Sequence, residues 1–203
     1  MATTTIDPPE ITAASDARRR AILDAAVNVF VRYGFRKTSM EEVARAAQVS
    51  RQGLYLHFAT KEDLFREGVQ HTLSQSLAAA TAALRDPKLD LEARLLGAFD
   101  AMIGRYVGMS GASATDLAET ASALLGPILQ EHEERFAEAV ARTLSAGKLA
   151  AAYKSAGLTA RELADVFAAV ARGLKHSCGS QPAFREAMGN AVRALCLPLK
   201  GAR

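Results

Sequence analysis

The sequence predicts an all-α protein of nine helices, and three observations support that prediction. Alanine, the strongest helix former, occupies 42 of the 203 positions. Val, Ile and Thr are sparse and do not alternate with polar residues as they would in the strands of a sheet. Apolar residues instead recur at helical spacing between capping residues, Gly and Pro. The composition, 49% hydrophobic and 23% charged, is that of a globular chain and excludes wholesale disorder.

Four helices are expected in the N-terminal part of the chain, after a polar tail. Residues 1–15 are small, polar and Pro-containing, which predicts a disordered tail. Gly34 is a natural end for the first helix, because glycine readily adopts the left-handed conformation that closes a helix. The pattern Ser39-x-x-Glu42 is a capping box, and Ser50 can cap the helix that follows. The four helices are predicted over 16–33, 40–47, 51–58 and 61–85.

Five further helices are expected in the rest of the chain. Pro87 enforces a break, because proline lacks the N–H that continues a helix. The pair Gly126-Pro127 is predicted to divide the next long helical stretch into two helices. Thr159 begins a second capping box, and Pro182 suits the first turn of the last helix. The five helices are predicted over 91–107, 113–125, 128–146, 159–175 and 182–197.

The positive charge of the chain is concentrated in one segment. Residues 18–61 carry nine basic and three acidic side chains, whereas residues 62–203 carry 16 of each. A basic segment joined to a neutral body indicates a module that binds a polyanion, although a solvated basic face explains the charge equally well. The neutral sum over the body argues mildly against a strongly charged small ligand there.

Several other classes of protein are not indicated by the sequence. No stretch is long and apolar enough to span a membrane, and the N-terminus lacks the apolar region of a signal peptide, so we expect a cytoplasmic protein. Cys178 and Cys196 form no disulfide framework, and the four histidines lack metal-ligand spacing, so neither a metal nor a cofactor is expected. His176 and Cys178 together suggest a metal or thiol sensor only weakly. No nucleophile elbow or phosphate loop is present, and we expect no enzymatic activity.

Residues 39–58 are predicted to form a helix-turn-helix. Two short helices joined by about three residues carry apolar side chains where the two helices pack against each other, namely Val43, Ala47, Val49, Leu54 and Phe58. Because Ser50 caps the second helix, Arg51 and Gln52 project from its N-terminal end, which contacts base edges in such motifs. Arginine can bind guanine O6 and N7, and glutamine can bind adenine N6 and N7. The plainer alternative is a helical hairpin in an ordinary bundle.

The same region resembles a known family. Residues 18–65 are similar to the DNA-binding domain of TetR-type transcriptional regulators, and the similarity lies in AILDAAVNVFVRYGF, TSMEEVARAA, VSRQGLYLHF and TKEDLF. The resemblance implies a homodimeric, ligand-responsive repressor that binds double-stranded DNA at a palindromic operator. It also implies a DNA-binding domain over 16–76 and a domain over 77–203 that binds a small-molecule effector and forms the dimer.

The resemblance further implies which residues contact DNA. The implied contacts are Lys37, Thr38 and Ser39 before the second helix, Ser50, Arg51, Gln52 and Gly53 on the recognition helix, and Tyr55, His57 and Lys61 at phosphates. Alternatively, Tyr55 is a core aromatic, His57 covers the first helix and Lys61 is a solvated lysine. Residues 18–20 either form an arm in the minor groove or begin a solvated helix. The chain departs from the family at Gln48, where glycine is usual, and a left-handed Gln48 costs about 1–2 kcal/mol.

Two further sets of residues are predicted in the C-terminal body. Candidate effector-lining residues are Phe99, Met102, Tyr106, Leu117 and Phe167, although core packing explains their spacing equally well. The resemblance implies a dimer interface through the last two helices, with Leu163, Val166, Phe167, Val170, Leu174, Met188, Val192 and Leu195. The rival hypothesis is a helical small-molecule-binding or interaction protein that no longer reads DNA.

Overall fold

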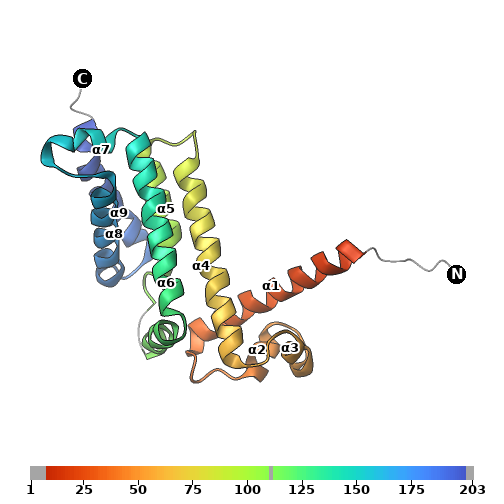
Figure 1. The fold of residues 1–203 in the computed structure, drawn as a ribbon. Coiled ribbons are helices and arrows are strands. Elements are labelled where there is room, and N and C mark those ends of the chain that lie inside the picture. The colour runs from red at the N-terminus through yellow and green to blue at the C-terminus, as the bar shows by residue number, and fades with distance from the viewer. Residues whose placement is uncertain (1–7, 110–111, 200–203) are drawn as a thin grey trace. The chain divides into compact units, whose positions relative to one another are not determined.

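A computed structural model of the chain describes residues 8–109 and 112–199. In this part the chain forms nine α-helices, three short 3-10 helices and no strand, which confirms the all-α prediction (Figure 1). The helices are α1 (Pro8–Tyr33), α2 (Met40–Ala46), α3 (Arg51–His57), α4 (Lys61–Arg85), α5 (Leu91–Met102), α6 (Ala112–Ala146), α7 (Leu149–Ala152), α8 (Ala160–Ser177) and α9 (Gln181–Cys196). The 3-10 helices are η1 (Gly104–Tyr106), η2 (Lys154–Ala156) and η3 (Leu197–Leu199).

The described residues form two compact units that are discontinuous in sequence. Unit 1 comprises residues 8–72 and 112–126, and unit 2 comprises residues 73–109 and 127–199. Helices α4 and α6 each contribute their first part to unit 1 and their second part to unit 2. The predicted division into 16–76 and 77–203 differs from this one mainly because the start of α6 packs with the N-terminal helices.

The core of unit 1 is shared by its first four helices. Phe30 of α1 meets Phe65 of α4 edge-on with ring centres 5.2 Å apart, and Phe35 lies 5.0 Å from Phe65. Other buried apolar side chains in this unit are Ile22, Leu23, Ala26, Val29, Met40, Val43, Ala44, Leu54, Phe58, Leu64 and Leu125. Because α2 and α3 bury only a few side chains each, this shared core is what fixes them in place.

The core of unit 2 surrounds Phe99 of α5. Its ring centre lies 5.1 Å from that of Phe136 in α6 and 6.0 Å from that of Phe167 in α8. Helices α8 and α9 pack on each other (Figure 1), and the Tyr153 hydroxyl donates to the carbonyl of Leu195 at 3.0 Å. Unit 2 is therefore an ordinary close-packed helical core.

Two helix boundaries differ from the sequence predictions at prolines. Helix α1 begins at Pro8, so the predicted disordered tail is wrong for residues 8–15, while residues 1–7 lie outside the described part. The first turn of a helix has no use for the N–H that proline lacks, and alanines continue the helix. Helix α6 runs unbroken through Pro127, although the sequence predicted a division there. Proline removes one hydrogen bond, to Ala123, and strong helix formers on both sides outweigh that loss.

The number of helices agrees with the prediction for a partly different reason. One helix replaces the two expected over 113–146, and the short α7 appears in the expected connection after Gly147. Helix α5 also ends at Met102, earlier than the predicted 107, and η1 follows it. The early helices α2, α3 and α4 match their predicted ranges within one residue.

Candidate nucleic-acid interface

The turn between α2 and α3 is defined by two caps and one left-handed residue. Ser39 Oγ accepts the Glu42 N–H at 3.2 Å and Glu42 Oε2 accepts the Ser39 N–H at 2.7 Å, so the predicted capping box is present. Ser50 Oγ accepts the Gly53 N–H at 2.9 Å and caps α3. Gln48 has a φ of 54°. The turn therefore requires the left-handed conformation, which glycine adopts with less strain than any other residue.

The exposed face of α3 carries four side chains in two neighbouring stripes. Arg51 and Tyr55 lie one turn apart, with the Arg51 guanidinium carbon 5.8 Å from the centre of the Tyr55 ring. Gln52 and Leu56 form the second stripe, again four residues apart. Tyr55 is 43% exposed and Leu56 is 81% exposed, whereas Leu54 is fully buried beneath them. The alternative of Tyr55 as a core aromatic is therefore wrong. This face combines a guanidinium, an amide, a hydroxyl and an apolar side chain, which are groups that contact bases and phosphates.

Further basic side chains lie near this face. Arg45 of α2 and Arg51 of α3 both line a hollow of about 370 Å³ between the two helices. Arg45 also lies 3.7 Å from Glu41 on the same helix, in an ion pair that is exposed to solvent. Lys37 is exposed in the connection that precedes α2. These cations can neutralise phosphates on either side of α3.

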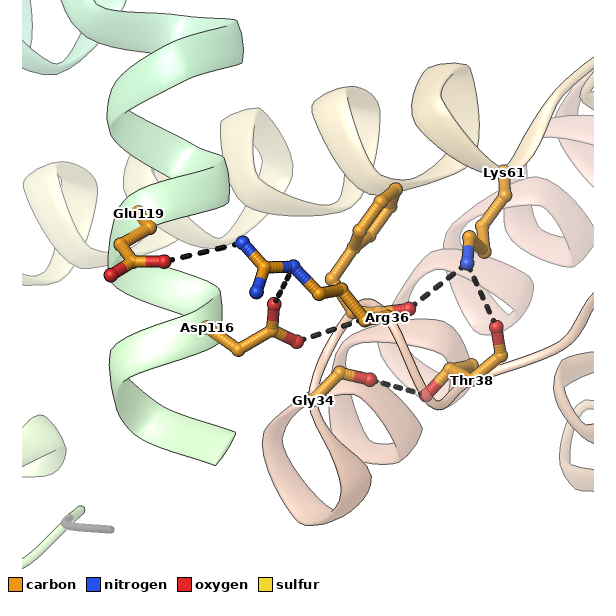
Figure 2. A network of polar contacts seen from close by, with 7 residues as sticks. Gly34, Arg36, Thr38, Lys61, Asp116 and Glu119 are labelled. Atoms are coloured by element: carbon orange, nitrogen blue, oxygen red, sulfur yellow. Dashed lines mark hydrogen bonds and ion pairs between the residues drawn. The ribbon is translucent and has the colours of Figure 1, made fainter. Parts of the chain in front are cut away.

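Thr38 and Lys61, two predicted DNA contacts, instead hold the connection between α1 and α2. Thr38 is 3% exposed, and its hydroxyl donates to the Gly34 carbonyl at 2.7 Å (Figure 2). Lys61 Nζ donates to the carbonyls of Phe35 and Thr38 at 3.0 and 3.1 Å, and it lies 4.4 Å from the centre of the Phe35 ring. Packing buries the Thr38 side chain, so its hydroxyl is not available to DNA, and the predicted contact of this residue with DNA stays a prediction. Lys61 is not the freely solvated lysine of the alternative hypothesis.

The remaining predicted contacts lie at the ends of α2 and α3. Ser39 and Ser50 are exposed, but their hydroxyls already serve as caps. His57 is half-buried next to Phe58, and its carbonyl accepts a hydrogen bond from Arg19 Nη1 at 3.0 Å. Arg19 also stacks over the Phe58 ring at 4.4 Å and forms an ion pair with Glu67. Residues 18–20 lie inside α1, so the minor-groove arm considered above is wrong.

A polar contact joins the start of α6 to the connection between α1 and α2. Asp116 Oδ2 accepts the backbone N–H of Arg36 at 2.9 Å, and the guanidinium of Arg36 lies 3.2 Å from Asp116 Oδ1 (Figure 2). The same guanidinium donates to Glu119 at 3.3 Å. All of these residues belong to unit 1. The segment 112–126 is thereby attached to the same connection that Lys61 and Thr38 stabilise.

Three residues of this site were not predicted from the sequence. Leu56 is the most exposed large hydrophobic side chain in the described part, and its spacing of four from Gln52 could have revealed it. Arg45 lies one turn after Glu41, and it entered the prediction only as one of the nine basic residues of the segment 18–61. Asp116 lies 80 residues from Arg36, and no local pattern connects two residues so far apart.

The five candidate effector-lining residues lie in different surroundings within the two units. Phe99 and Phe167 are fully buried and pack on each other, so they belong to the core of unit 2. The Tyr106 hydroxyl lies 3.0 Å from the buried Ser76 hydroxyl, and Met102 packs against the same core. Leu117 belongs to unit 1. The role of the five residues in binding an effector stays a prediction, because helical spacing marks core residues and lining residues alike.

The predicted dimer residues fall into two groups. The side chains of Leu163, Phe167, Met188 and Val192 are at most 1% exposed inside the core of unit 2, so their assignment to a partner surface is wrong. The others remain at least partly exposed, and they are Val166, Val170, Leu174 and Leu195. Val166, at 40% exposed, is the most open of the four. The interface itself stays a prediction.

Two other expectations concern metals and membranes. Within the described ranges, no three metal-ligating side chains of His, Cys, Asp or Glu come together. His176 is exposed and Cys178 is half-buried, at the C-terminal end of α8. None of the described helices has the length and apolarity that crossing a bilayer demands.

Comparison with known proteins agrees with this geometry. A family model described as bacterial regulatory proteins of the tetR family matches residues 22–67, which run from α1 into α4. The transcriptional regulator YfiR of Bacillus subtilis is 40% identical over 62 residues, which are 30% of each chain. The transcriptional activator FasR of Mycolicibacterium smegmatis is 36% identical over 88 residues, 42% of this chain and 40% of FasR. The chain thus aligns with less than half the length of these relatives.

A solved structure extends the likeness to the whole fold. The TetR-like transcriptional regulator of Rhodococcus sp. RHA1 superimposes with a TM-score of 0.59 at 21% identity, covering 92% of this chain and 97% of that one. At that identity the likeness concerns the fold alone. The matched proteins are transcriptional regulators rather than enzymes, in agreement with the expectation from the sequence. Residues 22–67 thus match the tetR family of bacterial regulatory proteins, and the fold of the described chain resembles that of a solved TetR-type regulator.

Proposed function

We propose that this protein is a ligand-responsive transcriptional regulator that binds a specific DNA sequence through α3. The observation that carries the proposal is the exposed face of α3, where Arg51 and Gln52 stand at the helix N-terminus with Tyr55 and Leu56 one turn beyond. Arginine and glutamine are the side chains that discriminate guanine and adenine most directly in the major groove. The concentration of basic residues in 18–61 supports the same proposal.

We assign the contacts with the DNA backbone to exposed side chains of the same unit. Lys37, Arg45 and the Tyr55 hydroxyl are exposed on or beside the two helices of the motif. Contacts of this kind fix the register of a protein on the duplex without reading its sequence. Lys61 acts indirectly in this proposal, because its ammonium holds the connection on which Lys37 lies.

The protein acts as a homodimer on a near-palindromic operator in this proposal. Two recognition helices related by two-fold symmetry reach successive major grooves about 34–36 Å apart, so the two half-sites mirror each other. The partly exposed apolar residues of α8 and α9, with Val166 the most open, support an interface there. Since a regulator acts where the chromosome is, the proposed compartment is the cytoplasm.

A small-molecule effector bound to unit 2 changes the affinity for DNA in this proposal. An effector can do this only by binding the two conformations of the protein with different affinities, and a complete swing from 1:99 to 99:1 requires about 5.5 kcal/mol. Repression is the proposed mode, since the family resemblance implies it. A reporter gene placed behind the operator distinguishes repression from activation by the sign of its response.

The rival function is a helical binding protein that has lost the ability to read DNA. The glutamine at position 48 in place of the usual glycine gives it some support. However, the left-handed φ of Gln48 and the intact caps of α2 and α3 favour a working motif. The two functions differ in one observable, which is salt-dependent and sequence-specific binding of duplex DNA.

Selection of bound sequences from a random duplex pool tests the proposal. Selection is done at about 150 mM salt to suppress non-specific phosphate binding. The expected result is a palindrome whose half-site centres lie about 10–10.5 base pairs apart, or a multiple of that spacing. Absence of enrichment with folded protein would overturn the proposal and favour the rival function.

A further inference from the structure

A groove of about 530 Å³ lies within unit 2, between α4, the start of α5 and the end of α6. Its lining includes Thr81, Leu84 and Arg85 of α4, Asp90, Leu91 and Arg94 at the start of α5, and Ala139, Arg142 and Thr143 of α6. A second hollow of about 490 Å³ shares Thr81, Arg85, Ala139 and Arg142 with it. The two are therefore parts of one continuous groove. Its volume falls within the range of small-molecule sites, about 300–1,000 Å³.

The charge of the groove is positive although the body as a whole is neutral. Arg85, Arg94 and Arg142 line the first part, where Asp90 is the single acidic residue. The Asp90 carboxylate is already used, because it accepts the Ala93 N–H at 2.8 Å as the cap of α5. Arg142 is far from Arg85 and Arg94 in the sequence, and only folding brings it to them. The neutral charge sum from the sequence therefore concealed a local excess of positive charge.

The guanidinium groups in the groove have donors left for a ligand. Arg85 is exposed and makes no hydrogen bond or ion pair with any residue in the described part of the chain. Arg142 is tied only by a long, exposed contact of 3.5 Å to Glu138. Arg94 uses its Nε on the Leu89 carbonyl at 2.8 Å, which orients the rest of its guanidinium. An arginine fork with free N–H groups matches a carboxylate or phosphate in a bidentate manner.

The floor of the groove is apolar. Leu84 is 3% exposed and Ala139 is 8% exposed, and Leu89 at 38% exposed stands at the rim. The Thr143 hydroxyl is turned back to the Ala139 carbonyl at 3.0 Å, so it adds little polarity to the floor. The groove thus pairs a ring of positive charge with an apolar surface, and it complements a molecule with an anionic head and a short apolar body.

We propose that this groove binds an organic anion, a carboxylate or phosphate ester with an apolar body, and that this anion is the effector. The proposal rests on the proposed function, since an effector acts by changing the affinity for DNA. Arg85 and Arg142, which line both parts of the groove, bind the anionic group. Arg94 binds the same group from the α5 side. Leu84 and Ala139 contact the apolar body.

Direct binding to the full chain tests the groove without DNA. Calorimetry is done with octanoate, octyl phosphate and the uncharged 1-octanol, which share one apolar chain and differ in the head. We expect at least one anion to bind at least tenfold more tightly than 1-octanol. The combined variant Arg85→Ala/Arg142→Ala is expected to weaken that anion at least tenfold, and Arg85→Lys to weaken it less, because lysine keeps the charge without the fork. The control Arg172→Ala removes an exposed arginine of α8 outside the groove and is expected to change nothing.

Two results would overturn the groove as an anion site. One is that neither anion binds better than 1-octanol, and the other is that the double variant binds as well as the wild-type protein while circular dichroism shows that it is folded. The effector role is tested separately, with the duplex recovered from the pool selection. Release of that duplex by the bound anion supports the role, and unchanged affinity overturns it. If the protein binds no duplex at all, the proposed function fails, whereas the calorimetry still decides the groove.

Discussion

Asp116 of α6 lies against Gly34 at the end of α1, so closely that a β-carbon on Gly34 would be only 2.7 Å from the Asp116 Oδ2 atom. The same oxygen accepts the N–H of Arg36, and Gly34 itself has a φ of +86°. Position 34 thus requires glycine for two independent reasons, its left-handed backbone and the approach of a carboxylate. The sequence indicated only the first of them.

Replacing Gly34 tests both reasons. The substitution Gly34→Ala is expected to lower the free energy of unfolding by about 1–3 kcal/mol, because alanine pays for the left-handed backbone and also collides with Asp116. In an Asp116→Ala background the collision is gone, and the same substitution is expected to cost only about 1 kcal/mol. Urea denaturation of the four proteins measures the difference. Equal costs in the two backgrounds would show that the carboxylate does not constrain position 34.

Replacing Gln48 is expected to change the free energy of unfolding in the opposite direction from replacing Gly34. The substitution Gln48→Gly is expected to raise the free energy of unfolding by about 0.5–1 kcal/mol, because glycine relieves the left-handed strain and loses part of that gain to its own chain entropy. The side chain of Gln48 is exposed, so little packing is lost. A loss of stability in urea denaturation would mean that the glutamine makes a compensating interaction. The control Ala47→Gly lies next to it at a right-handed φ of −80° and is expected to destabilise.

Substitutions of Lys61 and Lys37 distinguish a residue that holds the connection before α2 in place from a residue that contacts a DNA phosphate. The substitution Lys61→Met removes two hydrogen bonds from a charged donor, and a loss of stability of about 1–3 kcal/mol is expected. Lys37→Met alters an exposed side chain, so stability is expected to change by less than about 0.5 kcal/mol. In DNA-binding titrations, Lys37→Met is expected to reduce the slope of log affinity against log salt by about 0.9, for one lost phosphate contact. An unchanged slope would remove Lys37 from the interface.

Leu56 is expected to contact a thymine methyl group. An apolar side chain one turn beyond Gln52 can touch the methyl of a base pair next to the one that the amide binds. Replacing thymine by deoxyuridine at each operator position in turn removes one methyl, and a loss of about 0.8 kcal/mol is expected at one position of each half-site. The same scan with Leu56→Ala is expected to show no such position. If every uracil is tolerated by the wild-type protein, Leu56 contacts only the sugar-phosphate backbone or solvent.

The capping box of α2 gives a pH-dependent prediction. The Ser39 N–H and the Ser39 hydroxyl both donate to the Glu42 carboxylate and hold the pKa of Glu42 below its ordinary value of 4.5. The N–H has the larger effect, the hydroxyl the next, and the charge of Arg45 a smaller one. Because the pKa is lowered on folding, the cap contributes fully above pH 4.5 and its contribution is lost as the pH falls through the lowered value. The substitution Glu42→Gln is expected to abolish this pH dependence. A carbon-detected NMR titration of Glu42 with a midpoint at or above 4.5 would contradict the expectation.

The fold was predictable wherever a local signal determined the structure. The stop at Gly34 gave the end of α1, and the caps at Ser39 and Ser50 gave the starts of α2 and α3, because each signal acts within one turn. Pro127 misled the prediction, since a proline costs one hydrogen bond but a long alanine-rich helix supplies many. Local sequence signals therefore predict where a helix ends, but they predict poorly whether two neighbouring helical stretches form one continuous helix.

The site was predictable only where exposure follows from helix geometry. Arg51, Gln52 and Tyr55 face solvent as expected, whereas Leu54 on the same helix is buried. The burial of the Thr38 side chain was not predictable, because it depends on how the connection folds back toward Gly34. Periodicity could not tell residues such as Phe167 or Met188 that face their own core from residues that face a partner. The groove arginines were missed because Arg85 and Arg142 meet only through the tertiary fold.

The central claim is that the exposed face of α3 reads a DNA sequence, and one comparison tests it most directly. Random-pool selections are run in parallel with the wild-type protein, with Arg51→Ala and with Arg172→Ala, which removes the same charge from α8. One palindrome is expected for the wild-type protein and for Arg172→Ala. For Arg51→Ala we expect the same palindrome with relaxed preference at one base pair of each half-site and affinity weaker by about 1–3 kcal/mol. An identical preference at every position in all three selections, or no enrichment in any, would contradict the central claim.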